Sequence, residues 1–184
     1  MSRASRKIDI LNAASRIVSE KGIFNLTLEA VAKEAGFSKG GLLYHYPSKE
    51  ALVEGMVEHL TQSYDQKIAE KAQSDPQEMG RWLRAYVDVT FNDTYKNKDM
   101  NYGLMAAKAV NEELLDPIRE LYVKWQSAIE NEGIDPIEAT IIRLATDGMW
   151  LAEIFDLYHI DDETKEKINQ RLIDWINEWE NDKK

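Results

Sequence analysis

The hydrophobic residues of this chain recur every three to four positions, which is the spacing of helices that bury one face. No stretch sustains the alternation of apolar and polar residues that marks a strand. The pattern therefore predicts an all-α fold of about nine helices. Taken between capping residues, the predicted helices span residues 5–20, 27–35, 38–46, 48–72, 76–97, 100–110, 117–132, 136–158 and 161–179.

Short polar signals mark where several of these helices begin and end. The pairs Asp75-Pro76, Asp116-Pro117 and Asp135-Pro136 each place an N-cap acid before a proline, a residue that suits the first helical position. Gly22 and Gly36 follow the first two helices, and glycine readily adopts the left-handed conformation that ends a helix. These signals set the boundaries given above.

The helices at 136–158 and 161–179 carry more apolar surface than one core-facing stripe requires. Such helices are buried on more than one side, so they predict a homodimer that pairs each helix with its copy. The alternative is that both helices lie in the middle of a monomeric bundle. The candidate interface residues are Leu151, Ile154, Phe155, Leu172, Ile176 and Trp179.

Composition narrows the class of protein. The chain has 184 residues and no cysteine, which excludes disulfides, thiolate metal sites and cysteine nucleophiles. The start MSRASRKIDI has basic residues but no apolar h-region after them, so it does not predict a signal peptide. No apolar run is long enough to predict a membrane span. We expect a cytoplasmic protein without a metal or other cofactor.

Charge is distributed unevenly along the chain. The formal net charge is −10, yet residues 1–49 hold eight Lys and Arg against four Asp and Glu. Such asymmetry favours a basic N-terminal part that meets a polyanion and an acidic remainder that does not. The alternative is that surface charges simply scatter this way.

The stretch SKGGLLYHYPSK, residues 38–49, weakens helices at two places. Gly40 and Gly41 lie in the first turn of a predicted helix, where each glycine costs roughly 1 kcal/mol relative to alanine. Lys49 puts a positive charge at the electropositive start of the next helix. Both features make sense beside DNA, because glycine permits close approach and a backbone phosphate attracts Lys49. Together with the preceding helix, the stretch predicts a helix-turn-helix over residues 27–46.

Residues 10–52, ILNAASRIVSEKGIFNLTLEAVAKEAGFSKGGLLYHYPSKEAL, closely resemble the DNA-binding head of the tetracycline-repressor (TetR) family of bacterial transcriptional regulators. The resemblance implies a three-helix DNA-binding head at 1–48 and a helical body for ligand binding and dimerisation at 49–184. It also implies a homodimer that binds a pseudo-palindromic operator in double-stranded DNA. Such a regulator typically acts as a repressor, and a small-molecule inducer in the body releases it.

The resemblance also assigns roles to residues of the head. It implies phosphate contacts for Thr27, Tyr44, His45 and Lys49, and base-edge contacts for Ser38, Lys39, Gly40 and Gly41. Arg3, Arg6 and Lys7 would add phosphate contacts from the N-terminal arm. The sequence departs from the family pattern at Gly41, often threonine or asparagine, and at Leu43. Lys39 is therefore expected to carry more of the base readout here.

Aromatic residues and methionines in the later helices suit an apolar, adaptable ligand cavity. Within this set Asp147 lies in an apolar stretch and favours a cationic ligand, so we expect a largely apolar small molecule, with an aromatic cation as one version. The alternative for each residue is ordinary core packing. The candidates are Met56, His59, Leu60, Trp82, Tyr86, Thr90, Tyr102, Met105, Trp125, Asp147, Met149 and Trp150.

Other functional classes fit the sequence less well. Three histidines lie far apart, and no metalloprotease motif, nucleophile triad or Gly-rich phosphate loop is present, so we do not expect an enzyme. A helical small-molecule-binding or interaction protein without DNA binding remains an alternative, as does a regulator that activates transcription. The sequence leaves open the operator, the regulated genes and the ligand.

Overall fold

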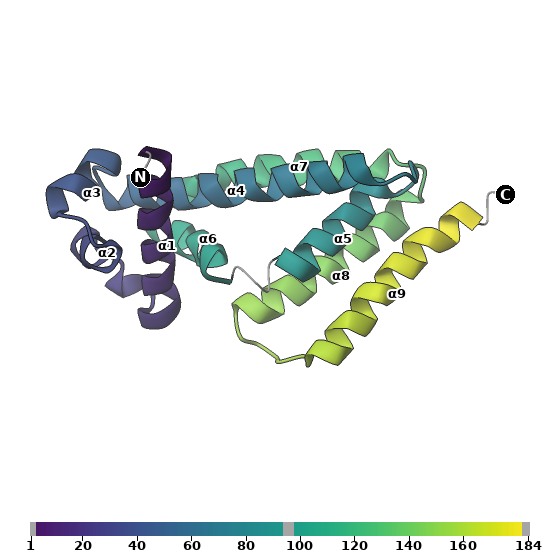
Figure 1. Cartoon of the computed structure of the whole chain (residues 1–184). Helices are drawn as coiled ribbons and strands as arrows, with labels where there is room; N and C mark the ends of the chain where they lie inside the picture. The colour runs from purple at the N-terminus through teal and green to yellow at the C-terminus, as the bar shows by residue number, and fades with distance from the viewer. Residues whose placement is uncertain (1–2, 94–97, 182–184) are drawn as a thin grey trace. The chain divides into compact units, whose positions relative to one another are not determined.

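The structure, a computed structural model, describes residues 3–93 and 98–181, and all secondary structure in these ranges is helical. The elements are α1 (Arg3–Lys21), η1 (Ile23–Asn25), α2 (Leu28–Ala35), α3 (Lys39–His45), α4 (Lys49–Ser74), α5 (Arg81–Asp93), α6 (Lys98–Val110), η2 (Glu112–Leu115), α7 (Asp116–Glu130), α8 (Pro136–Ile154) and α9 (Asp162–Asn181) (Figure 1). Nine α-helices lie within the described residues, and they confirm the predicted fold class. None of the described helices has the length and apolar character needed to cross a membrane.

The chain forms two compact units. The head unit contains residues 1–62 and 97–119, and the body unit contains residues 63–96 and 120–184. The head unit is larger than the segment 1–48, because the first half of α4 and the whole of α6 pack with the N-terminal helices. A Cβ atom built on Gly103 of α6 would lie 3.1 Å from the Cβ of Met56 in α4, so these helices approach closely.

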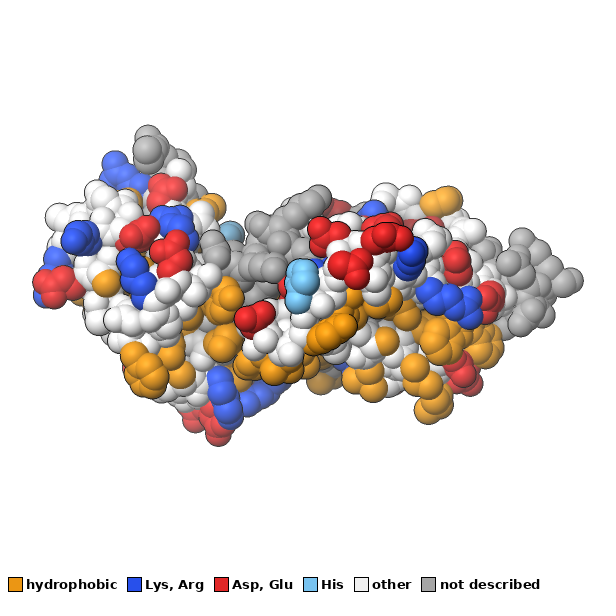
Figure 2. Space-filling view, turned by 90° about the horizontal axis from the view of Figure 1, so that it is seen from below, with side chains coloured by type: hydrophobic (Ala, Val, Ile, Leu, Met, Phe, Trp, Pro, Cys, Tyr) orange, Lys and Arg blue, Asp and Glu red, His pale blue; other side chains and the backbone are white. Residues whose placement is uncertain are grey.

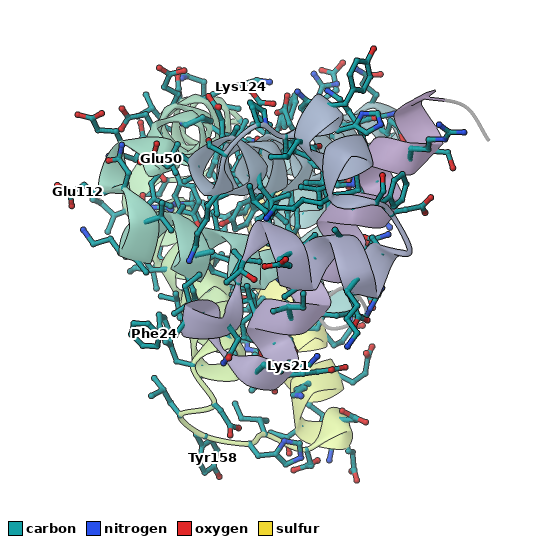
Figure 3. All side chains as sticks on the ribbon, turned by 90° about the vertical axis from the view of Figure 1, so that its left-hand side faces the viewer. Lys21, Phe24, Glu50, Glu112, Lys124 and Tyr158 are labelled. Atoms are coloured by element: carbon teal, nitrogen blue, oxygen red, sulfur yellow. The ribbon has the colours of Figure 1, made fainter. Side chains whose placement is uncertain are left out.

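The core of the head unit is made by residues with the predicted helical spacing. Ile10, Ala14 and Ile17 of α1 are buried together with Val31 of α2 and Leu42 of α3. Ala106 and Ala107 of α6 join the same core. Phe24 of η1 lies outside it and is 95% exposed (Figure 3). The apolar faces of the short helices therefore hold α2 against α1 and α3 against α2.

In the body unit α5 packs against α8 and α9 (Figure 1). Gly80 precedes α5 with φ +73°, and a Cβ atom there would lie 2.7 Å from Ile176 Cγ2, so a side chain at this position would be both strained and crowded. The first N–H groups of α5 are satisfied from far along the chain. The carboxylate of Glu132 accepts hydrogen bonds from Trp82 N at 2.8 Å and from Leu83 N at 3.2 Å.

Two of the three predicted Asp-Pro caps are wrong. Asp75 does not start a helix, because its carboxylate accepts hydrogen bonds from Gln77 N and from Arg84 Nε, and α5 begins only at Arg81. Asp116 has helical dihedral angles and continues the chain from η2 into α7, so it is not an N-cap. Asp135 is confirmed as the cap of α8, since it accepts from the N–H groups of Ile137 and Glu138.

The predicted end of the helix at 136–158 is also wrong. α8 ends at Ile154, and Asp156 has φ 50°, a left-handed conformation that a helix cannot continue through. Leu157 and Tyr158 are 74% and 70% exposed in the connection to α9, which Asp161 caps. The predicted C-terminal turn of the fifth helix, 94–97, lies outside the described residues. The other boundaries agree with the prediction to within a few residues, apart from the start of that helix.

Candidate nucleic-acid interface and effector site

Local sequence builds the pair α2–α3. Thr27 Oγ1 caps α2 by accepting from Ala30 N at 3.1 Å, and Ser38 Oγ caps α3 by accepting from Gly41 N at 3.1 Å. Between the helices Gly36 adopts φ +72°, and Phe37 N donates to Ala32 O at 2.8 Å. This is the glycine-terminated helix end that allows a tight turn, and it gives a helix-turn-helix.

The N-terminal end of α3 is exposed to solvent. Ser38, Lys39 and Gly40 are exposed, while Leu42 one turn later is fully buried and anchors the helix. A Cβ atom built on Gly40 would meet nothing within 4 Å, whereas one on Gly41 would lie 3.2 Å from Ser38 Oγ. The fold itself therefore gives no reason for glycine at position 40. An absent side chain there leaves the backbone open to close approach from outside.

The one ion pair described for Lys39 is weak. Its Nζ lies 3.8 Å from Glu29 Oε1, and the two side chains are 62% and 81% exposed. Pairs this exposed contribute little, because solvent screens them and holding two long side chains costs entropy. Lys39 can thus exchange Glu29 for another partner without a large penalty.

Of the residues with expected phosphate roles, Thr27 and Tyr44 are exposed, and His45 and Lys49 are half-buried. Tyr44 is 69% exposed, and its ring stands edge-on to that of His45 at 5.3 Å. Lys49 is the first residue of α4, whose start Ser48 caps by accepting from Ala51 N at 3.0 Å. Of the N-terminal arm, Arg6 and Lys7 are exposed, and the side chain of Arg3 lies outside the described part of the structure.

The body unit holds a buried polar cluster around Asp147 of α8. Its carboxylate accepts hydrogen bonds from the hydroxyls of Tyr86 on α5 and Tyr122 on α7, and from Arg143 on α8. The Arg143 nitrogen lies 3.0 Å from Asp147 Oδ2, and the guanidinium lies 5.5 Å from the centre of the Tyr122 ring. Trp125 stands edge-on to Tyr86 at 5.5 Å and gives the cluster an aromatic wall.

Burial dominates the electrostatics of this cluster. It raises the pKa of Tyr86 well above its ordinary value, and the Tyr122 hydroxyl and the Asp147 charge act in the same direction. Burial and the Asp147 charge raise the pKa of Tyr122 to about 12. Burial also raises the pKa of Asp147, although its hydrogen bonds and Arg143 oppose the shift. Both tyrosines therefore remain neutral donors at neutral pH.

The Asp147 carboxylate thus has partners within the chain, since it is paired with Arg143 and accepts from two hydroxyl donors. A cationic ligand would have to compete with Arg143 for this carboxylate, and the cationic version of the ligand stays a prediction. Within the described residues of the body unit, Arg143 Nε and Trp150 Nε1 are buried donors without an acceptor, and Gln126 Oε1 and Asn169 Oδ1 are buried acceptors without a donor.

The structure brings together only part of the predicted ligand set. Tyr86, Trp125 and Asp147 meet in the cluster, whereas Met56 is fully buried in the core of the head unit. The candidates in the head unit are Met56, His59, Leu60, Tyr102 and Met105, and those in the body unit are Trp82, Tyr86, Thr90, Trp125, Asp147, Met149 and Trp150.

Sequence reasoning missed two members of the cluster, Tyr122 and Arg143. The spacing of Arg143 and Asp147, one helical turn apart, was a signal for their ion pair. Nothing in the sequence marks Tyr122, whose role depends on the packing of α7 against its neighbours.

The residues of the predicted dimer interface differ in their burial within one protomer. Leu172 and Ile176 of α9 are 6% and 1% exposed within a single protomer, so they belong to the core of the body and not to an interface. Ile154 and Trp179 are half-buried. A row of exposed apolar residues lies on α8 and at its C-cap at helical spacing; it consists of Ile137, Ile141, Leu144, Leu151 and Phe155, hereafter the α8 stripe. Figure 2 shows exposed hydrophobic side chains gathered along the body.

Comparisons with known proteins agree with this architecture. The N-terminal model of the tetR family of bacterial regulatory proteins matches residues 10–56, and a tetracyclin repressor-like C-terminal domain model matches residues 80–177. This chain belongs to the TetR family. It is a DNA-binding transcriptional regulator with a C-terminal ligand-binding domain, and the family is non-enzymatic.

Individual relatives agree with the family assignment. The chain is 31% identical to the HTH-type transcriptional regulator LmrA of Bacillus subtilis, over 72% of this chain and 73% of that protein. It is 30% identical to the regulator YvdT of the same organism, over 71% and 68% of the two chains. A TetR-family regulator from Rhodococcus sp. has the same fold, with a TM-score of 0.71 and 20% identity over 94% of this chain and 97% of that one.

Proposed function

We propose that this regulator is a cytoplasmic repressor that binds a pseudo-palindromic operator as a homodimer and leaves it when a small molecule binds in the body. The observation that supports the DNA-binding part of the proposal is the exposed N-terminal end of α3. Its exposed backbone and glycine at a position where the fold needs none suit insertion into a major groove.

In this proposal α3 contacts the base edges of the operator, and residues around α3 contact the phosphates of the DNA backbone. Lys39 and Ser38 reach base edges, and Gly40 and Gly41 let the helix approach them. The phosphate contacts come from both sides of the helix-turn-helix. They are Thr27 at the start of α2, Tyr44 and His45 at the end of α3, and Lys49 at the start of α4.

The α8 stripe supports the homodimer. Ile137, Leu144 and Leu151 are 69%, 55% and 41% exposed, and such an apolar row along a surface helix is costly in water. A two-fold axis would bury the stripe against its own copy. Two heads could then read half-sites about one helical turn apart, roughly 10 bp.

The Asp147 cluster supports an effector of a particular chemistry. Arg143 Nε is a buried donor of this cluster without an acceptor, so an effector beside it would bring a hydrogen-bond acceptor such as a carboxylate or carbonyl oxygen. Aromatic rings of Tyr122 and Trp125 would pack on its apolar part. Release from DNA requires that the effector bind one conformation more tightly, with a coupling energy of typically 1–3 kcal/mol.

Selection of DNA from a random pool by the purified protein tests the proposal. We expect a two-fold symmetric site, whose affinity falls steeply with salt because bound phosphates release counterions. A reporter gene placed behind that site should be silenced by the protein, and activation instead would refute repression. Salt-independent or absent duplex binding would favour a helical ligand-binding protein without DNA binding.

A further inference from the structure

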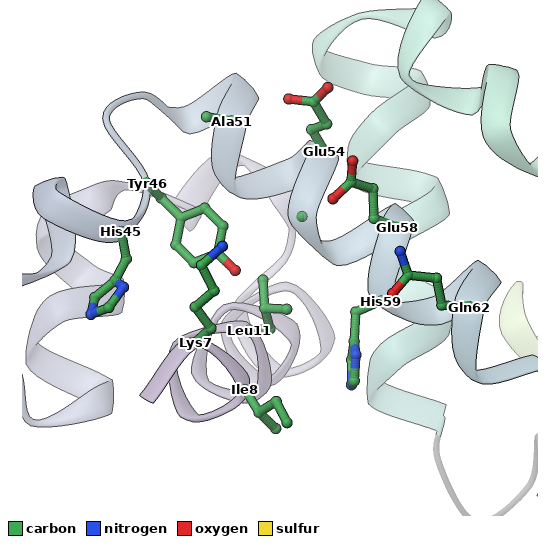
Figure 4. A pocket seen from close by; sticks show the side chains of 11 residues that line it. Lys7, Ile8, Leu11, His45, Tyr46, Ala51, Glu54, Glu58, His59 and Gln62 are labelled. Atoms are coloured by element: carbon green, nitrogen blue, oxygen red, sulfur yellow. The ribbon is translucent and has the colours of Figure 1, made fainter. Parts of the chain in front are cut away.

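We propose that the head unit carries a second small-molecule site, specific for an organic cation and separate from the body. The site is a groove of about 470 Å³ that α1, the end of α3 and α4 line (Figure 4). Its volume lies in the range of pockets that hold small ligands. Every lining residue belongs to the head unit.

The ring of Tyr46 is seated in this groove by a glycine. A Cβ atom on Gly55 would lie 2.6 Å from Tyr46 Cε1, so any other residue at position 55 would push the ring away from α4. Gly55 lies inside a long helix, where glycine is unfavourable. The chain thus keeps a glycine in α4, and that glycine leaves room for an aromatic ring in the lining of the groove.

Two carboxylates give the groove its charge. Glu54 and Glu58 stand one turn apart on α4, both exposed, and within the described residues neither has an ion-pair partner. Like charges at this spacing are unfavourable in an isolated helix. Burial raises the pKa of the Tyr46 hydroxyl, and the charge of Glu58 acts in the same direction.

A cationic side chain of the protein itself already lies over the aromatic ring of this groove. Lys7 Nζ lies 5.8 Å from the centre of the Tyr46 ring, which is the arrangement of a cation–π contact. Lys7 is exposed and has a flexible side chain, so a ligand can displace it. The two glutamates outnumber this one ammonium, and the remaining negative charge favours a cationic ligand.

These features define the class of ligand. An ammonium group would lie between Glu54 and Glu58, and an aliphatic chain would pack on Tyr46 and Ile8. A bare metal ion fits less well, because no group of three potential metal ligands occurs within the described residues. Since His45 and Tyr46 close α3, the ligand would contact the end of the helix that we place in the major groove.

Titration of the full-length protein without DNA tests this site. In low salt we expect 1,5-diaminopentane to bind saturably by calorimetry, and the neutral 1,5-pentanediol not to bind. The double variant Glu54→Gln, Glu58→Gln should weaken diamine binding at least tenfold. Glu50→Gln is the matched control, because Glu50 is an exposed acid one turn earlier on α4 and outside the groove (Figure 3).

Lys7→Met provides a test in the opposite direction. Removing the competing ammonium should strengthen diamine binding severalfold, and Arg6→Met, which removes a neighbouring charge outside the groove, should change it less. Unchanged circular dichroism would show that the variants are folded. The proposal is overturned if no saturable binding occurs, if the diol binds as well as the diamine, or if Glu50→Gln weakens binding as much as the double variant.

Discussion

The candidate sites of the head and the body differ in how deeply they are buried. In the head the candidate contacts are exposed or half-buried residues within and next to one helix-turn-helix, and α2 and α3 are each capped by the residue before them. In the body the polar site is buried, and Asp147 meets Tyr86 and Tyr122, which are 61 and 25 residues away. A substitution in a surface site leaves the packing of the core intact, whereas a substitution in a buried site also disturbs that packing.

The largest expected effect concerns the α8 stripe, which we propose as the dimer interface of the body. Leu144→Glu puts a charge in the middle of the α8 stripe, where a buried unpaired carboxylate costs several kcal/mol. We expect monomers in sedimentation and a loss of operator affinity of about 100-fold or more, because one head contacts only one half-site. Val123→Glu on α7 is the matched control, since Val123 is 71% exposed and lies outside the stripe. A Leu144→Glu variant that stays dimeric would refute the proposed interface.

The second prediction distinguishes the buried core of the body from the exposed α8 stripe. Ile176→Ala should lower the free energy of unfolding by about 2–4 kcal/mol, because Ile176 is 1% exposed and its removal leaves a cavity beside α5. Ile137→Ala, at a position 69% exposed, should change protomer stability by less than about 0.5 kcal/mol. Denaturant unfolding measures both. A small loss for Ile176→Ala would show that α9 packs loosely on the body.

The three Asp-Pro pairs show why helix boundaries were harder to predict in the body. Asp135 caps α8 as local rules require. Asp75 has the same local sequence, but Arg84 draws its carboxylate away, and Glu132, from fifty residues along the chain, accepts from the first N–H groups of α5 instead. Local signals predicted the element but not its start, because the deciding partners come from distant segments.

The candidate sites follow the same division. The local structure and exposure of Ser38, Lys39 and Gly40 could be predicted, since a short motif fixes both, and their contacts with bases stay a prediction. The pairing of Asp147 with Tyr86 and Tyr122 depends on how three helices pack, and periodicity alone cannot give it. Leu172 and Ile176 were misplaced for a similar reason, because an apolar helix face does not reveal whether its partner is the same chain or a copy.

The next effect tests the division of roles within the head. Lys39→Ala should cost about 1–3 kcal/mol on the preferred operator and relax the preference at one base position. Lys49→Ala should weaken binding to all sequences alike and reduce the slope of log affinity against log salt by about 1. Fluorescence anisotropy over a salt series on cognate and scrambled duplexes distinguishes the two. If Lys39→Ala weakens both duplexes equally, Lys39 is a phosphate contact and not a base reader.

The smallest effect gives the sharpest comparison, because stability and function should change in opposite directions. Gly40→Ala adds a methyl group that meets nothing within 4 Å in the free protein. Alanine is favoured over glycine in helices, so the free energy of unfolding should rise by about 0.5 kcal/mol, somewhat less than in a helix interior. The same methyl group lies at the end of α3 that we place in the major groove, so operator affinity should fall. Gly41→Ala is the internal comparison, since its methyl group would lie 3.2 Å from Ser38 Oγ, so Ser38 must shift slightly and the gain in stability should be smaller than for Gly40→Ala. If Gly40→Ala binds the operator as tightly as the natural chain, the backbone of α3 does not approach DNA closely at this position, and the reason proposed here for its glycine is wrong.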